Sequence, residues 1–300
     1  MARQYHRMRG AALLVGSCVL FSTTGCLVRA GAHIGPLRMV LFRFAIGLVI
    51  IAAAAASGRV RLRFNDKRLL FLRGLTGGIA VFIAFTAITK LGLGKGTVII
   101  CSYPIFASIF SAIFLKEKLR LLNVASIAVA FAGIYLISSD GGNGLWAFSV
   151  FGKYELLTIF GAVLSGIAVT LIRKLHDTDD SVAIYFSQCA VGLCVMIVPA
   201  CKSGLAIEPA GMLLLAGIGI SATIGQLLMT EGYKYVPVRT GSLLCMLDPV
   251  LAYIAGVVIF AEPLAARSVI GAVFVVAACA LVLVGQKDAP DAIEIGGVEA

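Results

Sequence analysis

Long apolar segments dominate the chain, and short polar or Gly/Pro-rich breaks separate them. A segment of about 20 mainly apolar residues is long enough to cross a bilayer as a helix. The pattern therefore predicts an all-α integral membrane protein with ten transmembrane helices. The predicted spans are residues 10–29, 36–56, 69–89, 94–115, 121–138, 153–173, 181–201, 210–231, 239–260 and 267–285.

The composition agrees with this pattern, because 60% of the residues are hydrophobic, 13% are charged and the mean hydropathy is +1.02. Soluble domains carry about 25% charged residues. Ten spans of about 20 residues leave no room in this chain for a soluble catalytic domain. The lipid bilayer is therefore an expected partner of the protein.

The net charge of +10 would suggest nucleic acid in a soluble chain, but the basic residues follow the predicted topology. With the N-terminus inside, 17 of the 25 basic residues fall on the inner side, including the cluster from Arg59 to Arg73, and 7 fall on the outer side. Arg43 is left inside a span. The positive-inside rule then places both termini, and the tail 287–300, in the cytoplasm. We expect a multi-pass protein of a bacterial cytoplasmic (inner) membrane and no nucleic-acid partner.

An internal repeat appears when the chain is shifted on itself by 145 residues. The repeated unit holds five spans, and an odd number makes the second copy enter the membrane from the opposite face. The sequence therefore predicts two inverted five-helix repeats, at 10–138 and 153–286. Secondary transporters with this symmetry bind substrate near the midplane between the repeats. Matched pairs include Gly16/Gly161, Gly47/Gly192, Gly96/Gly241, Pro104/Pro249 and Glu117/Glu262.

Two segments that end in the paired glutamates carry a family resemblance. AITKLGLGKGTVIICSYPIFASIFSAIFLKE (87–117) and GYKYVPVRTGSLLCMLDPVLAYIAGVVIFAE (232–262) share small residues, a proline, an apolar run and a glutamate. They resemble EamA-type members of the drug/metabolite transporter superfamily, as does the Arg43-Phe44 pair in PLRMVLFRFAIG (36–47). The resemblance covers about residues 10–286 and implies a transporter of a small metabolite. The sequence departs from its own symmetry at Asp248, where the first repeat has Tyr103.

Arg43 and Asp248 are the clear ionisable residues deep in the predicted spans, where an unpaired charge is costly. Arg43 lies about 10 Å below the outer face and Asp248 about 14 Å from the inner face, at about 1.5 Å per residue. In a core about 30 Å thick their depths differ by about 6 Å, which an arginine can span. Two interpretations stay open. The residues form a structural ion pair, or Arg43 binds a helix carbonyl; alternatively, Arg43 binds an anionic group and Asp248 an amine or a coupling proton.

Other residues extend this predicted site. Pro104 and Pro249, near the middle of spans four and nine, are expected to kink their helices and to act as hinges beside a cavity, although a packing kink is the alternative. The remaining candidates are polar or aromatic residues that could line the same cavity, or serve only as contacts between helices. The substrate-binding candidates are Arg43, Tyr103, Asp248, Gln188, Gln226, Thr23, Phe85 and Thr86.

These features favour a secondary transporter that moves a small metabolite, amino-acid-like or another organic solute, by alternating access. No P-loop motif is present, so ATP does not drive it directly. The histidines show no metal-ligand spacing and no GxSxG motif occurs, so we expect no enzyme activity, metal or cofactor. The alternatives are a membrane-embedded enzyme, or a channel or scaffold without carrier activity. A homodimer is compatible with the sequence.

Overall fold

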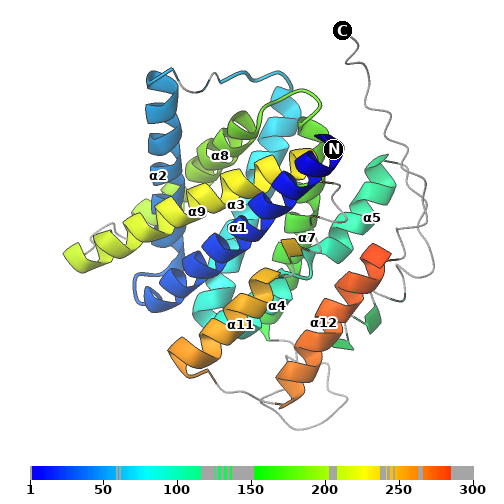
Figure 1. Ribbon diagram of the computed structural model, residues 1–300. Coiled ribbons are helices and arrows are strands. Elements are labelled where there is room, and N and C mark those ends of the chain that lie inside the picture. Colours follow the sequence, from blue (N-terminus) through cyan, green and yellow to red (C-terminus); the bar gives the residue numbers. More distant parts are fainter. Residues whose placement is uncertain are drawn as a thin grey trace.

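The fold is known from a computed structural model, shown in Figure 1. It describes residues 2–58, 60, 62–115, 125, 128–129, 132–133, 136, 152–202, 208–236, 241, 244–245, 247–262 and 266–284. Most of predicted span five, the link 139–151 and the tail 287–300 lie outside the described residues.

The described secondary structure is helical. Helix bounds follow the hydropathy pattern to within a few residues for most spans, because each apolar segment forms all of its backbone hydrogen bonds internally. The helices are α1 (Ala2–Ala30), α2 (Pro36–Ala56), α3 (Lys67–Leu91), α4 (Leu93–Ile100), α5 (Tyr103–Leu115), α7 (Lys153–Leu175), α8 (Ser181–Lys202), α9 (Pro209–Tyr235), α11 (Leu247–Phe260) and α12 (Ala266–Val284).

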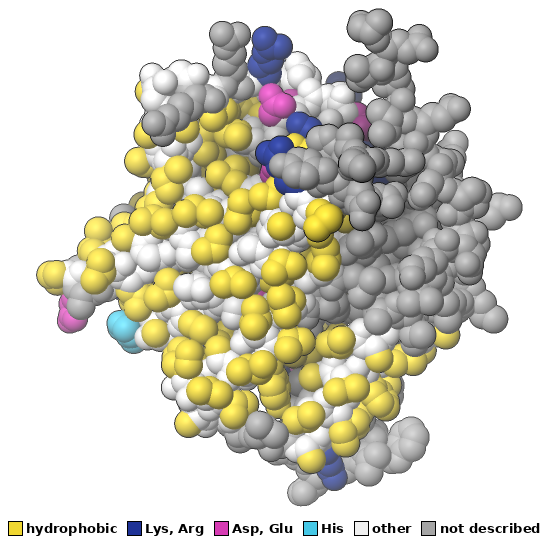
Figure 2. Space-filling model, in the orientation of Figure 1, with side chains coloured by type: hydrophobic (Ala, Val, Ile, Leu, Met, Phe, Trp, Pro, Cys, Tyr) yellow, Lys and Arg dark blue, Asp and Glu magenta, His cyan; other side chains and the backbone are white. Residues whose placement is uncertain are grey.

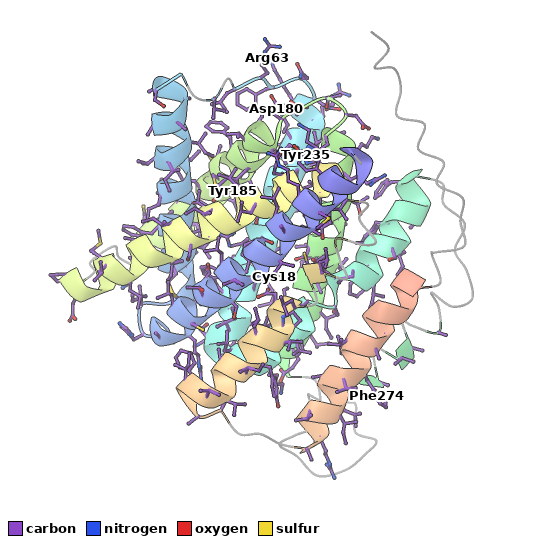
Figure 3. All side chains as sticks on the ribbon, in the orientation of Figure 1. Cys18, Arg63, Asp180, Tyr185, Tyr235 and Phe274 are labelled. Atoms are coloured by element: carbon purple, nitrogen blue, oxygen red, sulfur yellow. The ribbon has the colours of Figure 1, made fainter. Side chains whose placement is uncertain are left out.

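Seven helical segments among the described residues are long and apolar enough to cross a membrane, and two shorter apolar helical segments accompany them. Large apolar side chains face outward, as shown by Leu213 (79% exposed) and Val258 (76% exposed). Figure 2 shows hydrophobic side chains spread over the face of the molecule that is in view. Lysine and arginine side chains are gathered mainly near the end where Figure 3 places Arg63. An apolar exterior suits lipid contact, so the chain is a multi-pass integral membrane protein.

Local sequence fixes several helix starts. Pro36 and Pro209 each stand in the first turn of their helix, where the missing N–H has no intrahelical partner. Asp66 caps α3 by accepting a hydrogen bond from the Leu69 backbone N–H at 3.0 Å. Gly92, with φ of 93°, lets the chain leave α3 and enter α4 at once.

Helices of the two halves of the chain interdigitate. In Figure 1, α1 lies alongside α9, and α3 packs on α7 in the same way. Similarly α3 packs on α8 while α2 packs on α9, and α2 packs directly on α8. The repeat pairs α1 with α7, α2 with α8 and α3 with α9. The α1–α9 contact then corresponds to α3–α7 and the α3–α8 contact to α2–α9, whereas α2–α8 corresponds to itself. The main core cluster, which includes Phe44, Phe85, Tyr185 and Leu215, lies where α2, α3, α8 and α9 meet.

Candidate substrate site

Four buried polar residues form what we call the arginine cluster: Arg43, Arg73, Gln188 and Gln226. They come from α2, α3, α8 and α9, two helices from each half of the chain, and 2–4% of each residue is exposed. Arg43 Nη2 donates to Gln226 Oε1 at 3.5 Å, and Arg73 Nη2 donates to Gln188 Oε1 at 3.1 Å. Each guanidinium thus contacts a neutral amide from the other half of the chain.

Aromatic rings surround the Arg43 guanidinium. Its central carbon lies 5.5 Å from the ring centroid of Phe85 and 5.9 Å from that of Phe44. Such cation–π contacts contribute about 0.5–2 kcal/mol. Tyr185, labelled in Figure 3 within the bundle, forms a hydroxyl–hydroxyl hydrogen bond of 3.0 Å with Thr223 at the same packing layer. The structure thus places the candidate Phe85 beside Arg43, and its role in substrate binding stays a prediction.

The charges of the arginine cluster are not balanced by any described acid. The ion pairs among the described residues are Arg29–Glu262 and Lys95–Glu155, and neither involves Arg43 or Arg73. Taking a charge out of water costs several kcal/mol, and neutral amides and ring faces offset that cost only in part. Arg43 and Arg73 are therefore buried charges for which the described residues supply no ion-pair partner.

The proposed contact between Arg43 and Asp248 is not present in the structure, which describes both residues. Asp248 is half-buried in the first turn of α11, where a negative charge is stabilised by the helix dipole. Its Oδ2 accepts a long contact of 3.9 Å from Cys101 Sγ. Similar depth did not bring the two side chains into an ion pair, because depth along the membrane normal does not fix which way a helix faces. Whether either residue binds substrate stays a prediction.

The structure replaces the expected kink at Pro104 by a break in the helix. Helix α4 ends at Ile100, Cys101 and Ser102 form a turn, and α5 begins at Tyr103. Pro104 is therefore the second residue of a new helix, where its missing N–H costs nothing. Pro249 likewise stands in the first turn of α11. Pro104 thus begins a helix rather than bending a continuous one, whereas residue 246, just before α11, lies outside the described residues. The role of both prolines as hinges stays a prediction.

The other candidates divide between the interior and the surface. Tyr103 is half-buried and packs against two apolar clusters near the helix break. Thr86 is buried, but its hydroxyl donates to the Phe82 carbonyl of its own helix at 2.8 Å. Thr23 is exposed and its hydroxyl donates to Val19 at 2.8 Å, so the structure does not bring it to the arginine cluster. Its neighbour Thr24 is buried instead.

Sequence reasoning missed Arg73, which it placed among the cytoplasmic basic residues. Glycines on the same helix explain its burial. A Cβ on Gly74 would lie 2.5 Å from the Ser187 carbonyl oxygen, and one on Gly78 would lie 2.9 Å from the Gly192 Cα. Helix α3 therefore approaches α8 closely, and Arg73 is carried into the interface with Gln188. The Arg-Gly-x-x-Gly-Gly pattern was the signal that could have found it.

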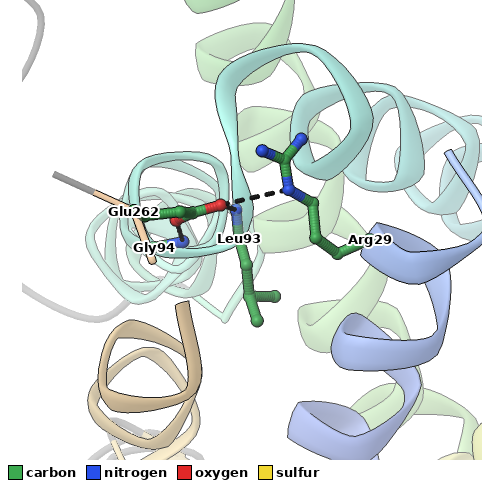
Figure 4. Close-up of polar contacts among 4 residues, drawn as sticks. All are labelled: Arg29, Leu93, Gly94 and Glu262. Carbon is green, nitrogen blue, oxygen red and sulfur yellow. Dashed lines mark hydrogen bonds and ion pairs between the residues drawn. The ribbon is translucent and has the colours of Figure 1, made fainter. Parts of the chain in front are cut away.

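Sequence reasoning also used Glu262 only as part of the repeat. At the end of the bundle opposite the N-terminus, Glu262 Oε1 accepts from the Leu93 N–H at 2.6 Å and Oε2 from the Gly94 N–H at 2.9 Å (Figure 4). Arg29 Nε lies 3.2 Å from the same Oε1. The carboxylate thus caps α4 and joins it to the end of α1. We call Arg29, Glu262 and the first turn of α4 the Glu262 clamp.

Glycines make room for this clamp. A Cβ on Gly92 or on Gly256 would lie 2.7 Å from a Glu262 carboxylate oxygen, so any side chain there would displace it. The Gly256 carbonyl also accepts from the Glu262 backbone N–H at 3.0 Å. The small residues of the repeated signature thus serve a packing purpose, which is to let α11 approach α4 around a half-buried carboxylate.

Comparison with known proteins identifies the family of this chain. A model of the EamA-like transporter family matches the chain twice, over residues 8–139 and 152–284. The chain belongs to the EamA-like transporter family. The resemblance noted in the sequence is therefore confirmed.

Named relatives of this EamA-like chain are transporters. It is 26% identical over 274 residues to the pseudopaline exporter CntI of Pseudomonas aeruginosa, a match that covers 90% of this chain and 94% of the exporter. It is 27% identical over 257 residues to solute carrier family 35 member G1 of Mus musculus, covering 81% and 70% of the two chains. The prediction that the protein is not an enzyme is confirmed by this family membership.

A solved crystal structure shares the fold of the EamA-like chain. The two superpose with a TM-score of 0.68 at 19% identity, and the match covers 91% of this chain and 97% of the other. The likeness concerns the arrangement of the helices.

Proposed function

We propose that this protein is a secondary transporter that moves a small organic solute across the bacterial cytoplasmic membrane by alternating access. The observation that carries the proposal is the arginine cluster, in which two buried arginines and two buried glutamines from both halves of the chain hydrogen-bond with each other. Ionisable residues inside membrane proteins mark substrate or ion pathways. The exporter and solute-carrier names of the relatives support the same reading.

The architecture that we propose is ten spans in two inverted five-helix repeats, at 10–138 and 153–286, with both termini and the tail 287–300 in the cytoplasm. Two observations support it. The family model matches once in each half, and the helix contacts between the halves are reciprocal. The described end that carries the N-terminus also carries Arg63, Lys67 and Arg68 at the start of α3, as the positive-inside rule requires of a cytoplasmic side.

In this scheme the two halves rock about the arginine cluster and expose it to each side in turn. The break before Pro104 is suited to be a hinge, because a helix that restarts can change direction without losing further backbone hydrogen bonds, and Pro249 in the first turn of α11 is proposed as its counterpart. The Glu262 clamp closes the outer end in the described conformation, since it ties α4 to the ends of α1 and α11. Opening to that side would require its hydrogen bonds to break.

The test is counterflow in liposomes that contain the purified full-length chain. Solutes are first selected by thermal stabilisation of the detergent-solubilised protein against amino acids, carboxylates, nucleosides and sugars. We expect uptake of a labelled hit to saturate and to accelerate when the same unlabelled solute is trapped inside. Uptake that neither saturates nor responds to trapped solute would favour a channel. Stabilisation without any flux would leave a binding scaffold and contradict the proposal.

A further inference from the structure

Hydrogen-bond donors without partners are concentrated in the arginine cluster. Arg43 Nε, Arg73 Nε, Arg73 Nη1 and Gln226 Nε2 are all buried and have no hydrogen-bond partner among the described residues. Burying such groups unsatisfied costs about 1–3 kcal/mol each, and more when they are charged. Every one of these atoms is a donor, so a hydrogen-bond acceptor would satisfy them, and the charge of the guanidinium groups favours an oxyanion as that acceptor.

The positive charge of the two arginines also favours an anionic ligand. Arginine stays protonated in proteins, and Arg43 and Arg73 stand on α2 and α3, which both pack on α8. Gln226 accepts a hydrogen bond from Arg43 and Gln188 accepts one from Arg73, but neither glutamine carries a charge. Asp248, the acid that could have balanced one of them, contacts Cys101 instead. Two cations without a described counter-charge match a ligand that carries two negative charges.

A purely structural role explains the geometry less well. An arginine that only joins helices would direct most of its donors to backbone carbonyls or acids, whereas Arg73 makes one described hydrogen bond, to Gln188. The protein also keeps space for the guanidinium. A methyl group on Gly77, one turn along α3, would overlap Arg73 Nη1 and would lie 3.1 Å from Gln188 Nε2. The glycine thus allows the guanidinium to lie against its own helix with free N–H groups.

We infer that Arg43 and Arg73 together bind the anionic group of the transported solute, and that this solute is a small organic anion with two negative charges, a dicarboxylate or a phosphate ester. The inference rests on the proposed transport function and assigns its substrate class. The planar forks of the arginines suit carboxylate and phosphate oxygens, and the Gln226 amide adds a neutral donor. Phe85 forms an apolar wall beside the charge.

The first measurement is thermal unfolding of the detergent-solubilised full-length protein, at constant ionic strength, with succinate, inorganic phosphate or the uncharged isostere succinamide. We expect succinate or phosphate to raise the unfolding temperature in a saturable way and succinamide to have no effect. Succinate and phosphate separate a carboxylate site from a phosphate site. Equal effects of both anions and of added sodium chloride would be an ionic-strength effect and would overturn the inference.

Variants then locate the binding. Gly77→Ala displaces the Arg73 guanidinium without changing any charge, whereas the matched control Gly16→Ala adds a methyl group 3.5 Å from Leu228, an ordinary contact. We expect Gly77→Ala to weaken anion binding at least tenfold and Gly16→Ala to leave it unchanged. Arg73→Gln should abolish the response to anions while the unliganded protein keeps or gains stability, because it removes a buried unpaired charge. A structural arginine predicts the opposite, which is lower stability with the anion response retained.

The outcomes separate this inference from the transport function. Counterflow of a neutral or cationic solute that persists in Arg73→Gln would leave the carrier intact and overturn the anion assignment. Anion binding that depends on Arg73 without any counterflow would support the site and contradict transport. Absence of stabilisation by both succinate and phosphate in the parent protein would also overturn the inference.

Discussion

Removal of the Glu262 carboxylate should loosen one end of the bundle selectively. Glu262 accepts hydrogen bonds from the first two N–H groups of α4 and forms an ion pair with Arg29. No other side chain caps this helix, since Gly92 precedes it. In Glu262→Ala, the Leu93 and Gly94 N–H groups would lose their acceptor in a partly buried place.

The size of the effect follows from these contacts. A capping side chain contributes about 0.5–2 kcal/mol, and a hydrogen bond to a charged group about 1.5–3 kcal/mol. The Arg29 side chain is 30% exposed, so we discount its ion pair to about 0–1 kcal/mol. Because these terms overlap, we expect Glu262→Ala to lower the local opening free energy of α4 by about 2–4 kcal/mol.

Hydrogen–deuterium exchange of the detergent-solubilised protein measures this directly. Since about 1.4 kcal/mol corresponds to a tenfold change, the amides of the first turn of α4 should exchange about 30-fold to several-hundred-fold faster in Glu262→Ala. Glu262→Gln keeps one acceptor oxygen and should fall between the parent and the alanine variant. The amides in the middle of α8 should exchange at the parent rate.

Glu208→Ala is the matched control, because Glu208 stands at the N-cap of α9, is exposed and makes no capping hydrogen bond. Equal exchange at Leu93 and Gly94 in the two alanine variants would refute the reasoning. So would a uniform increase along all helices in Glu262→Ala, which would mean that the residue stabilises the whole bundle rather than the clamp.

Three further predictions follow from the site and the loops. Arg43→Gln and Asp248→Asn should have additive effects on thermal unfolding, with a coupling below about 0.5 kcal/mol in a double-mutant cycle, because the structure shows no contact between them. A coupling above about 1 kcal/mol would show that the two side chains interact and would contradict this prediction. Pro104→Ala should change stability by less than about 1 kcal/mol, since the proline occupies the first turn of α5, yet slow counterflow if the break is a hinge. Parent-like flux would make it a packing feature. The His176 ring contacts the Thr230 carbonyl at 2.9 Å, and burial lowers the pKa of this histidine. Its contribution to the free energy of unfolding should therefore be complete above the ordinary pKa of about 6.5 and should decrease as the pH falls below that value. His176→Gln should reduce that decrease, as measured by unfolding temperature against pH.

The sequence alone determined which segments are helices and that they belong in a membrane. Hydropathy, length and helix-starting prolines located most helix bounds, since each segment forms its own backbone hydrogen bonds and needs no neighbour to do so. The repeated signature also identified the family, because its glycines, proline and glutamate stand at fixed positions along the chain. Candidate residues such as Arg43 and Gln226 were found by the same reasoning, as polar groups in apolar segments.

The tertiary structure decided which of these residues meet. Arg43 contacts Gln226 rather than Asp248, and Arg73 lies in the interior although its sequence neighbours at the start of α3 are basic. Hydropathy reports the cost of placing one segment in lipid. It does not report the rotation of that helix about its axis or the helix that packs on it. Those are set by close contacts between glycine faces and by hydrogen bonds across more than 100 residues of sequence, as in the clamp where Glu262 caps a helix from the other half of the chain.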